Sequence, residues 1–224
     1  MTTQEFSNEF DVLYNNIMSN AAPGLNEYEK SVLLTQAQEA LILDIYNGKF
    51  NENSFESTEE VSSYINTLVR QLRITDTVEG NGISKDSIFY KLPDDLWFIT
   101  YESVILKDDI LGCKNGQEVI VKPITQDKYY SINRNPFRKS NDKRVLRLLL
   151  DNKVELISKF KIESYLVRYL SKPEPIILDD LSTYGVTING KSEVTECKLN
   201  PAVHRTLLNK AVQLAKFIWT SGTQ

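Results

Sequence analysis

The segment KIESYLVRYLSKPEPIILDD, Lys161–Asp180, decides how this chain is divided. Its first half alternates aromatic or branched residues with polar ones, which predicts a long β-strand. Pro173 and Pro175 follow, and neither can donate a ladder hydrogen bond. An apolar run, Ile176–Leu178, comes directly afterwards. We therefore expect the strand to stop before the prolines, and we interpret them as a block to further pairing at a sheet edge.

Three amphipathic helices are predicted upstream, within residues 1–78. The first carries apolar residues at helical spacing: Phe6, Phe10, Leu13, Tyr14 and Ile17. The second begins at Asn26, with Glu29 as its capping-box partner, and ends at Gly48, which favours the left-handed conformation. Its apolar side holds Leu33, Leu34, Ala37, Leu41 and Ile45. The third begins at Ser57, with Glu60 at the matching position, and should bury Val61, Tyr64, Ile65, Leu68 and Leu72.

A β-rich region is predicted for residues 79–199. Its boundary lies at TVEGNGISKDS, because Gly80 and Gly82 are costly in a helix. The segments LWFITYESVIL, QEVIVKPIT and KRVLRLLL have the composition of strands. Asp151–Lys153 is a predicted hairpin turn, and Asn189–Gly190 is the strongest short hairpin signal in the chain.

The last predicted helix covers residues 200–224. Asn200 is a favourable N-cap, and Pro201 occupies the first helical position. Its apolar stripe contains Leu207, Leu208, Ala211, Leu214, Ala215 and Ile218. This stripe should pack on the N-terminal helices. The expected fold is therefore α+β: an N-terminal helical bundle completed by a C-terminal helix, with an inserted, mainly antiparallel β region.

Composition excludes several classes of protein. The chain has 224 residues and a net charge of −4, which disfavours a general nucleic-acid binder but allows a local basic patch. No apolar run reaches membrane-spanning length, and MTTQEFSNEF lacks the features of a secretory signal, so we expect a soluble protein. Cys113 and Cys197 lie far apart, which favours free thiols over a zinc or redox site.

Side chains that could carry chemistry are few. His204, the one histidine of the chain, falls in the first turn of the last predicted helix, where we expect a neutral, hydrogen-bonded packing residue. The acidic pairs Asp94–Asp95, Asp108–Asp109 and Asp179–Asp180 flank predicted strands, where aspartate is common. We expect no catalytic, metal or cofactor site. An enzyme that uses His204 or an acidic pair is the least favoured of the functional hypotheses considered.

A basic segment, SINRNPFRKSNDKR, spans residues 131–144. Its cationic residues are Arg134, Arg138, Lys139, Lys143 and Arg144. Tyr129, Tyr130 and Phe137 are interleaved with them or lie beside them. Such a pattern is compatible with nucleic-acid binding, with a contact to another protein, or with a plain solvated loop. The residues leave these three alternatives open.

Both ends of the chain resemble a known family. NEYEKSVLLTQAQEALILDIYNGK, Asn26–Lys49, resembles a helix of neck or ring proteins of crAss-like phages of Bacteroidales. YLVRYLSKPEPIIL, VTING and CKLNPAVHRTLLNKAVQLAK are similar to the C-terminal half of the same group. The closing helix also resembles that of podovirus head-to-tail adaptors, the tail tubular proteins A. The segment from about Gly80 to Asn141 carries no part of the resemblance.

The resemblance implies a virion structural protein without enzymatic activity or cofactor. Such proteins form a ring in the neck, usually of twelve copies, which docks beneath the portal and extends the DNA channel towards the tail. They are made in the host bacterial cytoplasm. The residues expected to contact neighbouring subunits or the portal are Arg134, Arg138, Lys139, Lys143, Arg144, Pro173 and Pro175. The alternative is a nucleic-acid-binding module that uses the basic loop 131–144.

Overall fold

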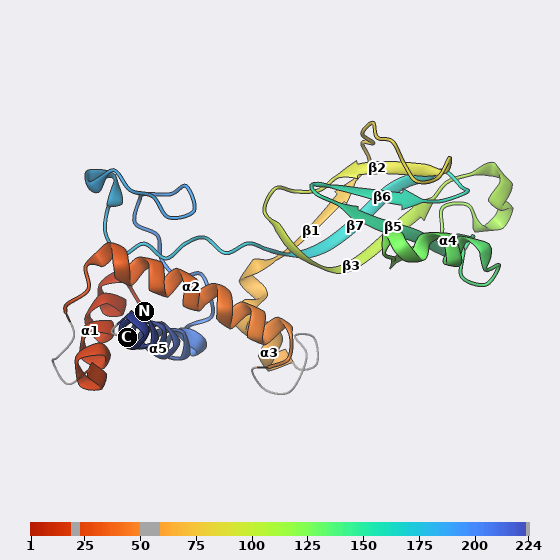
Figure 1. Ribbon diagram of the computed structural model, residues 1–224. Coiled ribbons are helices and arrows are strands. Elements are labelled where there is room, and N and C mark those ends of the chain that lie inside the picture. Colours follow the sequence, from red (N-terminus) through yellow and green to blue (C-terminus); the bar gives the residue numbers. More distant parts are fainter. Residues whose placement is uncertain (19–22, 50–58, 223–224) are drawn as a thin grey trace. The chain divides into compact units, whose positions relative to one another are not determined.

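The computed structural model describes residues 1–18, 23–49 and 59–222 (Figure 1). It contains helices and a seven-stranded sheet, so the predicted α+β class is confirmed. The chain packs into two compact units. We call Met1–Leu68 together with Pro173–Gln224 the helical unit, and Val69–Lys172 the sheet unit. The limits of the sheet unit therefore differ from the limits at residues 79 and 199 that we expected for the β-rich region.

Helices α1, α2 and α5 form the main body of the helical unit. Their bounds are Thr3–Met18, Glu27–Tyr46 and His204–Gly222. Helix α5 packs against both α1 and α2. The buried residues that join them include Phe6, Phe10, Leu34, Leu41, Ile45, Leu207, Leu208 and Ala211. Ile218, which we expected in the same apolar stripe, is exposed.

The predicted ends of α2 are both present. Asn26 Oδ1 accepts a hydrogen bond from the Glu29 backbone N–H at 2.8 Å, and Asn26 N–H donates to Glu29 Oε2 at 2.9 Å. This reciprocal capping box satisfies two donors that the first helical turn would otherwise leave unpaired. At the other end, Gly48 has φ +71°, a value that costs glycine little.

The third predicted helix is shorter than expected. Helix α3 covers Glu59–Ile65 and continues as a 3₁₀ turn, Asn66–Leu68. Leu72 was expected on its buried side, but this residue lies in strand β1 and is exposed. The prediction failed because a helical spacing of apolar residues does not exclude a strand, and pairing with another strand decided the conformation. The expected N-cap, Ser57, lies outside the described residues.

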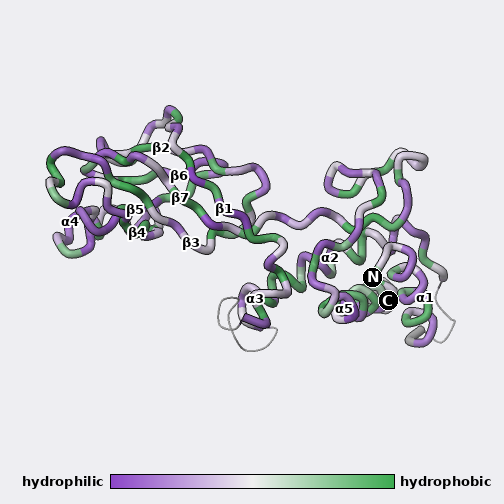
Figure 2. Tube along the Cα trace, turned by 180° about the vertical axis from the view of Figure 1, so that it is seen from behind, coloured by the Kyte–Doolittle hydropathy of each residue, from purple (hydrophilic) through white to green (hydrophobic). Residues whose placement is uncertain are grey.

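The sheet unit contains one sheet with strand order β1-β7-β3-β4-β5-β6-β2. All neighbouring strands pair antiparallel except β4 and β5, so the predicted, mainly antiparallel region is confirmed. The strands are Val69–Ile74, Ser87–Lys91, Leu96–Leu106, Glu118–Pro123, Arg144–Leu150, Lys153–Ile157 and Ile162–Ser171, from β1 to β7. Both hydrophobic and hydrophilic residues occur along these strands (Figure 2), and the clearest alternation of buried and exposed residues is in β4.

The two faces of the sheet bury different clusters. One face carries the larger core, which includes Val104, Val121, Val145, Leu156, Tyr165 and Val167. On the opposite face, Leu146, Leu148 and Ile157 pack under helix α4, Gln126–Arg134, through its buried Tyr129. Helix α4 thus covers part of that face, including the region of β5 and β6.

Helix α4 itself was not predicted. We expected residues 131–144 to form a loop, but Ser131–Arg134 is the last turn of this helix. The parallel pairing of β4 with β5 explains the difference, because parallel neighbours need a crossover connection rather than a tight turn. Loop residues 135–143 then lead from α4 into β5.

Both predicted hairpin turns are present. Asp151 and Asn152 join β5 to β6, where Leu150 is paired with Lys153. Asn189 and Gly190 have φ values of +49° and +79°, as a tight turn with two left-handed central residues requires. This second turn lies in the helical unit and joins only an isolated pair of bridged residues, not two strands of the sheet.

Candidate functional site

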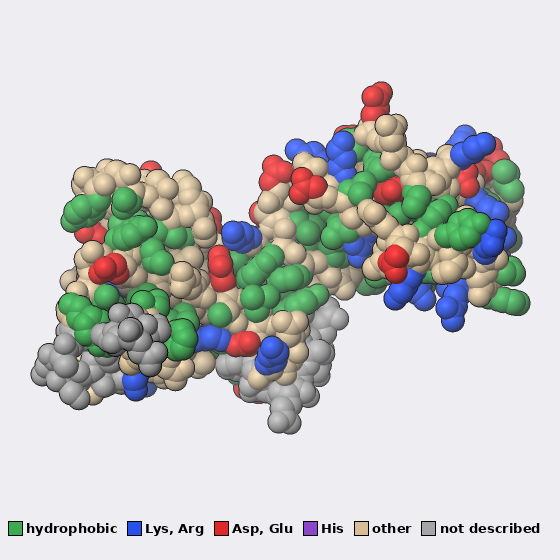
Figure 3. Space-filling view, viewed as in Figure 1, with side chains coloured by type: hydrophobic (Ala, Val, Ile, Leu, Met, Phe, Trp, Pro, Cys, Tyr) green, Lys and Arg blue, Asp and Glu red, His purple; other side chains and the backbone are tan. Residues whose placement is uncertain are grey.

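Five of the predicted site residues lie at one end of the sheet unit. Arg134 ends α4, Arg138 and Lys139 belong to the following turn, and Lys143 and Arg144 lead into β5. We call these five residues the basic surface. Lys and Arg side chains gather over this part of the sheet unit in Figure 3. The structure thus brings together the cationic residues that the sequence placed in one segment.

The members of the basic surface differ in how they are held. The Arg134 guanidinium lies over the Tyr130 ring, 4.3 Å from its centroid, which is a cation–π arrangement. Arg144 Nη2 donates a hydrogen bond to the Phe137 carbonyl at 2.6 Å, so this side chain helps to shape the loop. Arg138 and Lys143 are exposed, and neither forms a salt bridge with any residue that the structure describes. Their charges are therefore available to a partner.

Local hydrogen bonds fix the loop that carries the basic surface. Asn135 Oδ1 accepts from Phe137 N–H at 2.9 Å, and Asn141 Oδ1 accepts from Lys143 N–H at 2.9 Å. Asparagine commonly shapes turns in this way. Asp142, the acidic residue of this loop, is paired with Lys114. The hydrogen bond from Lys114 lowers the pKa of Asp142, so this carboxylate stays ionised and its charge is already compensated.

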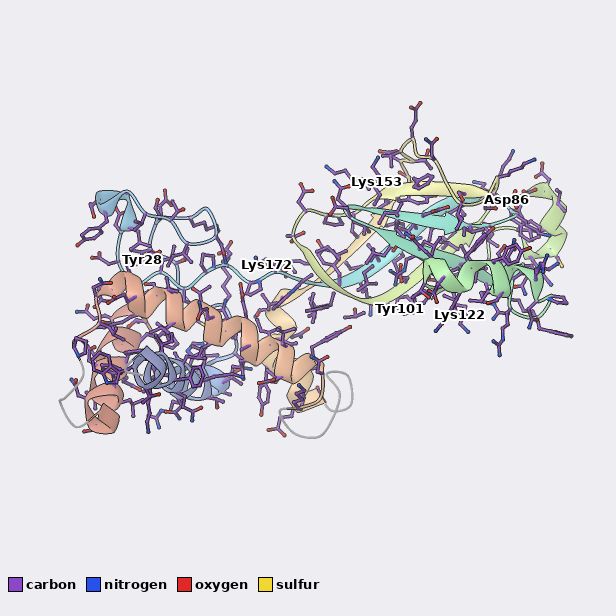
Figure 4. All side chains as sticks on the ribbon, viewed as in Figure 1. Tyr28, Asp86, Tyr101, Lys122, Lys153 and Lys172 are labelled. Atoms are coloured by element: carbon purple, nitrogen blue, oxygen red, sulfur yellow. The ribbon has the colours of Figure 1, made fainter. Side chains whose placement is uncertain are left out.

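Two aromatic rings and a small pocket accompany these charges. Tyr130 is 63 % exposed and Phe137 is 85 % exposed, and Phe137 belongs to the same loop. The pocket, of about 280 Å³, is lined by Lys122, Ile124, Ile132 and Arg138. Lys122, labelled in Figure 4, comes from β4 and adds a second cationic residue to the lining of the pocket. Two cationic and two aliphatic side chains thus line the pocket, a composition that suits an acidic side chain.

The two prolines lie elsewhere, and the structure contradicts the predicted role of blocking pairing at a sheet edge. Strand β7 ends at Ser171, just before them, as expected. However, β7 lies between β1 and β3 inside the sheet, so Pro173 and Pro175 cannot protect a sheet edge. Both prolines are buried within this chain. They end an interior strand where the chain passes from the sheet unit to the helical unit.

The segment after the first proline is fixed by α2. We call Glu174–Leu178 the extended segment. Gln38 Nε2 donates to the Glu174 carbonyl at 2.8 Å, Thr35 Oγ1 accepts from Ile176 N–H at 3.1 Å, and Ser31 Oγ accepts from Leu178 N–H at 3.0 Å. Residues 31, 35 and 38 lie on one side of a helix, which explains why α2 buries polar side chains. These contacts satisfy backbone groups that have no sheet partner.

The remaining candidates for chemistry have structural environments. His204 is buried; its Nε2 donates to the Leu199 carbonyl at 3.0 Å, and its Nδ1 accepts from the Met1 ammonium at 2.9 Å. Burial lowers the pKa of His204, which agrees with the predicted neutral packing residue. Burial also raises the pKa of Cys197 to about 11, so its thiol stays protonated at neutral pH.

The described residues contain neither a metal-binding cluster nor a membrane-spanning helix. Within residues 1–18, 23–49 and 59–222, no three His, Cys, Asp or Glu side chains are arranged to hold a metal ion. In the same part of the chain, no helix combines the length and the apolar character that crossing a membrane requires.

Comparison with known proteins decides the family. The sequence matches the family described as phage tail ring protein 3/4 over residues 1–224. The chain belongs to this family. It is 49 % identical to Ring protein 3 of Bacteroides phage crAss001, with 96 % of this chain and 95 % of that protein covered. It is 39 % identical to Ring protein 4/5 of the same phage, with coverage of 100 % and 96 %.

Family membership confirms the resemblance to ring proteins of crAss-like phages. The chain is thus a structural component of a phage virion. The match also extends through Gly80–Asn141, the segment for which the sequence had suggested no relative. That segment contains α4 and three of the five residues of the basic surface, so the family match covers this part of the sheet unit as well.

Proposed function

We propose that this protein forms a ring of identical copies in the phage neck, where it joins the portal to the tail and extends the DNA channel. The observation that carries the proposal is the family match along all 224 residues, together with 49 % identity to a ring protein over almost its whole length. A likeness that covers both units supports a shared architecture and a shared place in the virion.

The proposed partners are other copies of the chain, the portal protein, and further neck or tail proteins. The resemblance to portal-docking ring proteins favours twelve copies. The protein would be made in the host bacterial cytoplasm and act in the virion as a passage for DNA during ejection. It would need neither a cofactor nor a chemical step.

Charge supports passage of DNA without tight binding. A wall that is strongly basic would bind phosphates and release counterions, which slows sliding. The chain has 26 basic and 30 acidic residues, and its net charge is −4. On this proposal DNA passes through the lumen without sequence-specific contacts.

Negative-stain electron microscopy tests the proposal. The purified protein is imaged alone and after it has been mixed with the portal of its own virus. We expect rings, either free or assembled on the portal, with a symmetry that gives the copy number directly. Single particles in both samples would overturn the proposed function.

A second candidate function is nucleic-acid binding by the basic loop 131–144. It is favoured by the Arg134–Tyr130 stack and by the exposed Phe137 ring, because aromatic and cationic side chains together can hold single strands. A filter-binding assay with labelled single-stranded and duplex DNA at two salt concentrations tests it. Absence of salt-dependent binding would exclude this function.

A further inference from the structure

Charge is distributed unequally between the two units of the chain. The sheet unit, Val69–Lys172, has 19 Lys and Arg residues and 14 Asp and Glu residues, a net charge of +5. The helical unit has 7 basic and 16 acidic residues, a net charge of −9. A mildly acidic protein therefore consists of one cationic and one strongly anionic part. Such a separation favours association between unlike parts of two copies.

The helical unit has four exposed acidic residues in the stretch of chain that follows the extended segment and precedes α5. Ile177 is paired with Thr195, and Leu181 N–H donates to the Ser192 carbonyl at 2.9 Å. These contacts bring residues 179–180 next to residues 193–194. We call the four exposed acidic residues of this region the acidic surface: Asp179, Asp180, Glu193 and Glu196.

Nearby cations do not neutralise the acidic surface. Lys191 and Lys198 belong to the same region, but both are paired with Glu174, at 3.0 and 2.6 Å. These two hydrogen bonds lower the pKa of Glu174, which keeps it charged and able to hold both ammonium groups. Glu193 and Glu196 form no salt bridge with any described residue. The anionic charge is consequently left for a partner.

Exposed apolar side chains lie beside both charged surfaces. Tyr184 is 70 % exposed and Val194 is 49 % exposed next to the acidic surface. On the basic surface, Tyr130 and Phe137 are similarly exposed. Interfaces typically combine aromatic anchors with a rim of charges. The two surfaces therefore carry opposite charges, and both have exposed apolar side chains beside them.

We propose that the basic surface of one copy binds the acidic surface of the next copy, so that the ring is closed by a head-to-tail contact between a sheet unit and a helical unit. This inference rests on the proposed ring. A ring needs two unlike, complementary surfaces on every copy, because each subunit meets its two neighbours through different faces. The pocket between Lys122 and Arg138 would receive a carboxylate of the neighbour.

A second copy fits these observations better than a nucleic acid. The basic surface has a partner of opposite charge and similar apolar content within the same sequence, whereas the net charge of −4 works against general binding to phosphates. A surface that bound DNA would leave the acidic surface, with Tyr184 and Val194, unexplained.

Two charge-reversal variants of the full chain test the contact. Arg138→Glu with Lys143→Glu reverses the basic surface, and Glu193→Lys with Glu196→Lys reverses the acidic surface. Each variant alone should raise the apparent dissociation constant of self-association at least about tenfold, measured by sedimentation velocity. An equimolar mixture of the two should restore association, because each reversed surface then meets a complementary one.

A matched control for the reversed basic surface replaces two other cations of the sheet unit by glutamate, which gives the same change of charge. Lys85 and Lys159 are exposed, and Lys85→Glu with Lys159→Glu should associate as the wild type does. Circular dichroism checks that every variant is folded. If a reversal variant is unfolded, Arg138→Gln with Lys143→Gln replaces it, and this milder change should still weaken association several-fold.

The possible results distinguish a failure of the proposed contact from a failure of the proposed ring. If wild type forms rings and both reversal variants form them equally well, the proposed contact is wrong and the ring stands. The same holds if the mixture fails to restore association. If wild type forms no ring, alone or on the portal, both proposals fail. If Arg138→Glu with Lys143→Glu loses affinity for a labelled DNA duplex while association is unchanged, the basic surface binds nucleic acid instead.

Discussion

Replacing Arg147 by methionine should destabilise the sheet unit strongly. Arg147 Nε lies 3.0 Å from Glu102 Oε2, and the Tyr165 hydroxyl donates to Glu102 Oε1 at 2.5 Å. Glu102 is paired with Val167 and Arg147 with Leu156, so both charged groups lie on the face of the sheet that carries the larger core. Methionine keeps much of the length of arginine but removes the charge that compensates the Glu102 carboxylate.

The size of the effect follows from burial. The two side chains are only 5 % (Glu102) and 11 % (Arg147) exposed, so water cannot replace the lost partner. Removing one member of a buried ion pair typically costs about 3–5 kcal/mol, because the remaining charge is left uncompensated. The double variant Glu102→Gln with Arg147→Met removes both charges and keeps an oxygen that can accept from Tyr165. It should recover most of the loss, to within about 1–2 kcal/mol of wild type.

The assay needs a probe of the sheet unit alone. The chain has two tryptophans, Trp97 in β3 and Trp219 in α5. In a Trp219→Phe background, fluorescence during urea unfolding therefore reports on the sheet unit. Arg168→Met is the matched control: Arg168 is exposed on the sheet, and its loss should change the free energy of unfolding by no more than about 0.5 kcal/mol.

The pH dependence gives a second test of the same reasoning. Burial raises the pKa of Glu102, although Arg147 and Tyr165 oppose this shift. Without Arg147, the pKa of Glu102 in the folded protein is raised further by burial. At a pH above the pKa that Glu102 has in the unfolded chain, the folded variant therefore binds more protons than the unfolded variant. Its stability then falls as pH rises, by up to about 1.4 kcal/mol per pH unit, so the loss is smaller at pH 5 than at pH 7.5. The prediction is wrong if Arg147→Met lowers the free energy of unfolding by less than about 1 kcal/mol at pH 7.5, or if the double variant is as unstable as Arg147→Met.

Three further predictions concern other parts of the fold. Thr35→Val should lower the free energy of unfolding by about 1–3 kcal/mol in urea titrations, because it leaves a buried N–H of the extended segment unpaired. Gly82→Ala should lower the free energy of unfolding by about 1–3 kcal/mol in the same assay, because the new Cβ would lie 2.2 Å from the Cβ of Ser87. Gly24→Ala is the control, since open space surrounds Gly24 and no such loss of stability is expected. Burial lowers the pKa of His204 from its ordinary value, so the unfolded chain takes up this proton first as the pH falls. Stability should therefore decrease as the pH drops below about 6.5, the ordinary histidine pKa, and His204→Gln should reduce the difference between the urea midpoints at pH 7.5 and 5.5.

Features that depend on neighbouring residues were predictable. The Asn26–Glu29 capping box and the turn at Asn189–Gly190 each need a particular residue type at a fixed spacing, and both are present. Strand β3 has the predicted bounds, Leu96–Leu106, because β-branched and aromatic residues are concentrated there. The position of the basic residues in one segment also placed them on one surface.

Features that depend on distant partners were not predictable. Residues 69–74 allowed both a helix and a strand, and pairing with β7 decided between them. Lys122 was not proposed as a site residue. The alternation of β4 indicates that its side chain points away from the larger core, but only the β4–α4–β5 crossover brings it to the same pocket as Arg138.

Short-range sequence patterns were sufficient to predict the α+β class, the ends of α2, the tight turns, the basic segment and, through resemblance, the ring-protein family. Each of these is encoded by residues that are close together along the chain. Contacts between remote segments set the strand order, the interior position of β7, the attachment of the extended segment to α2, and the proximity of residues 179–180 to residues 193–194. The physical reason is that hydrogen bonds and packing between remote segments choose among local conformations that differ little in free energy.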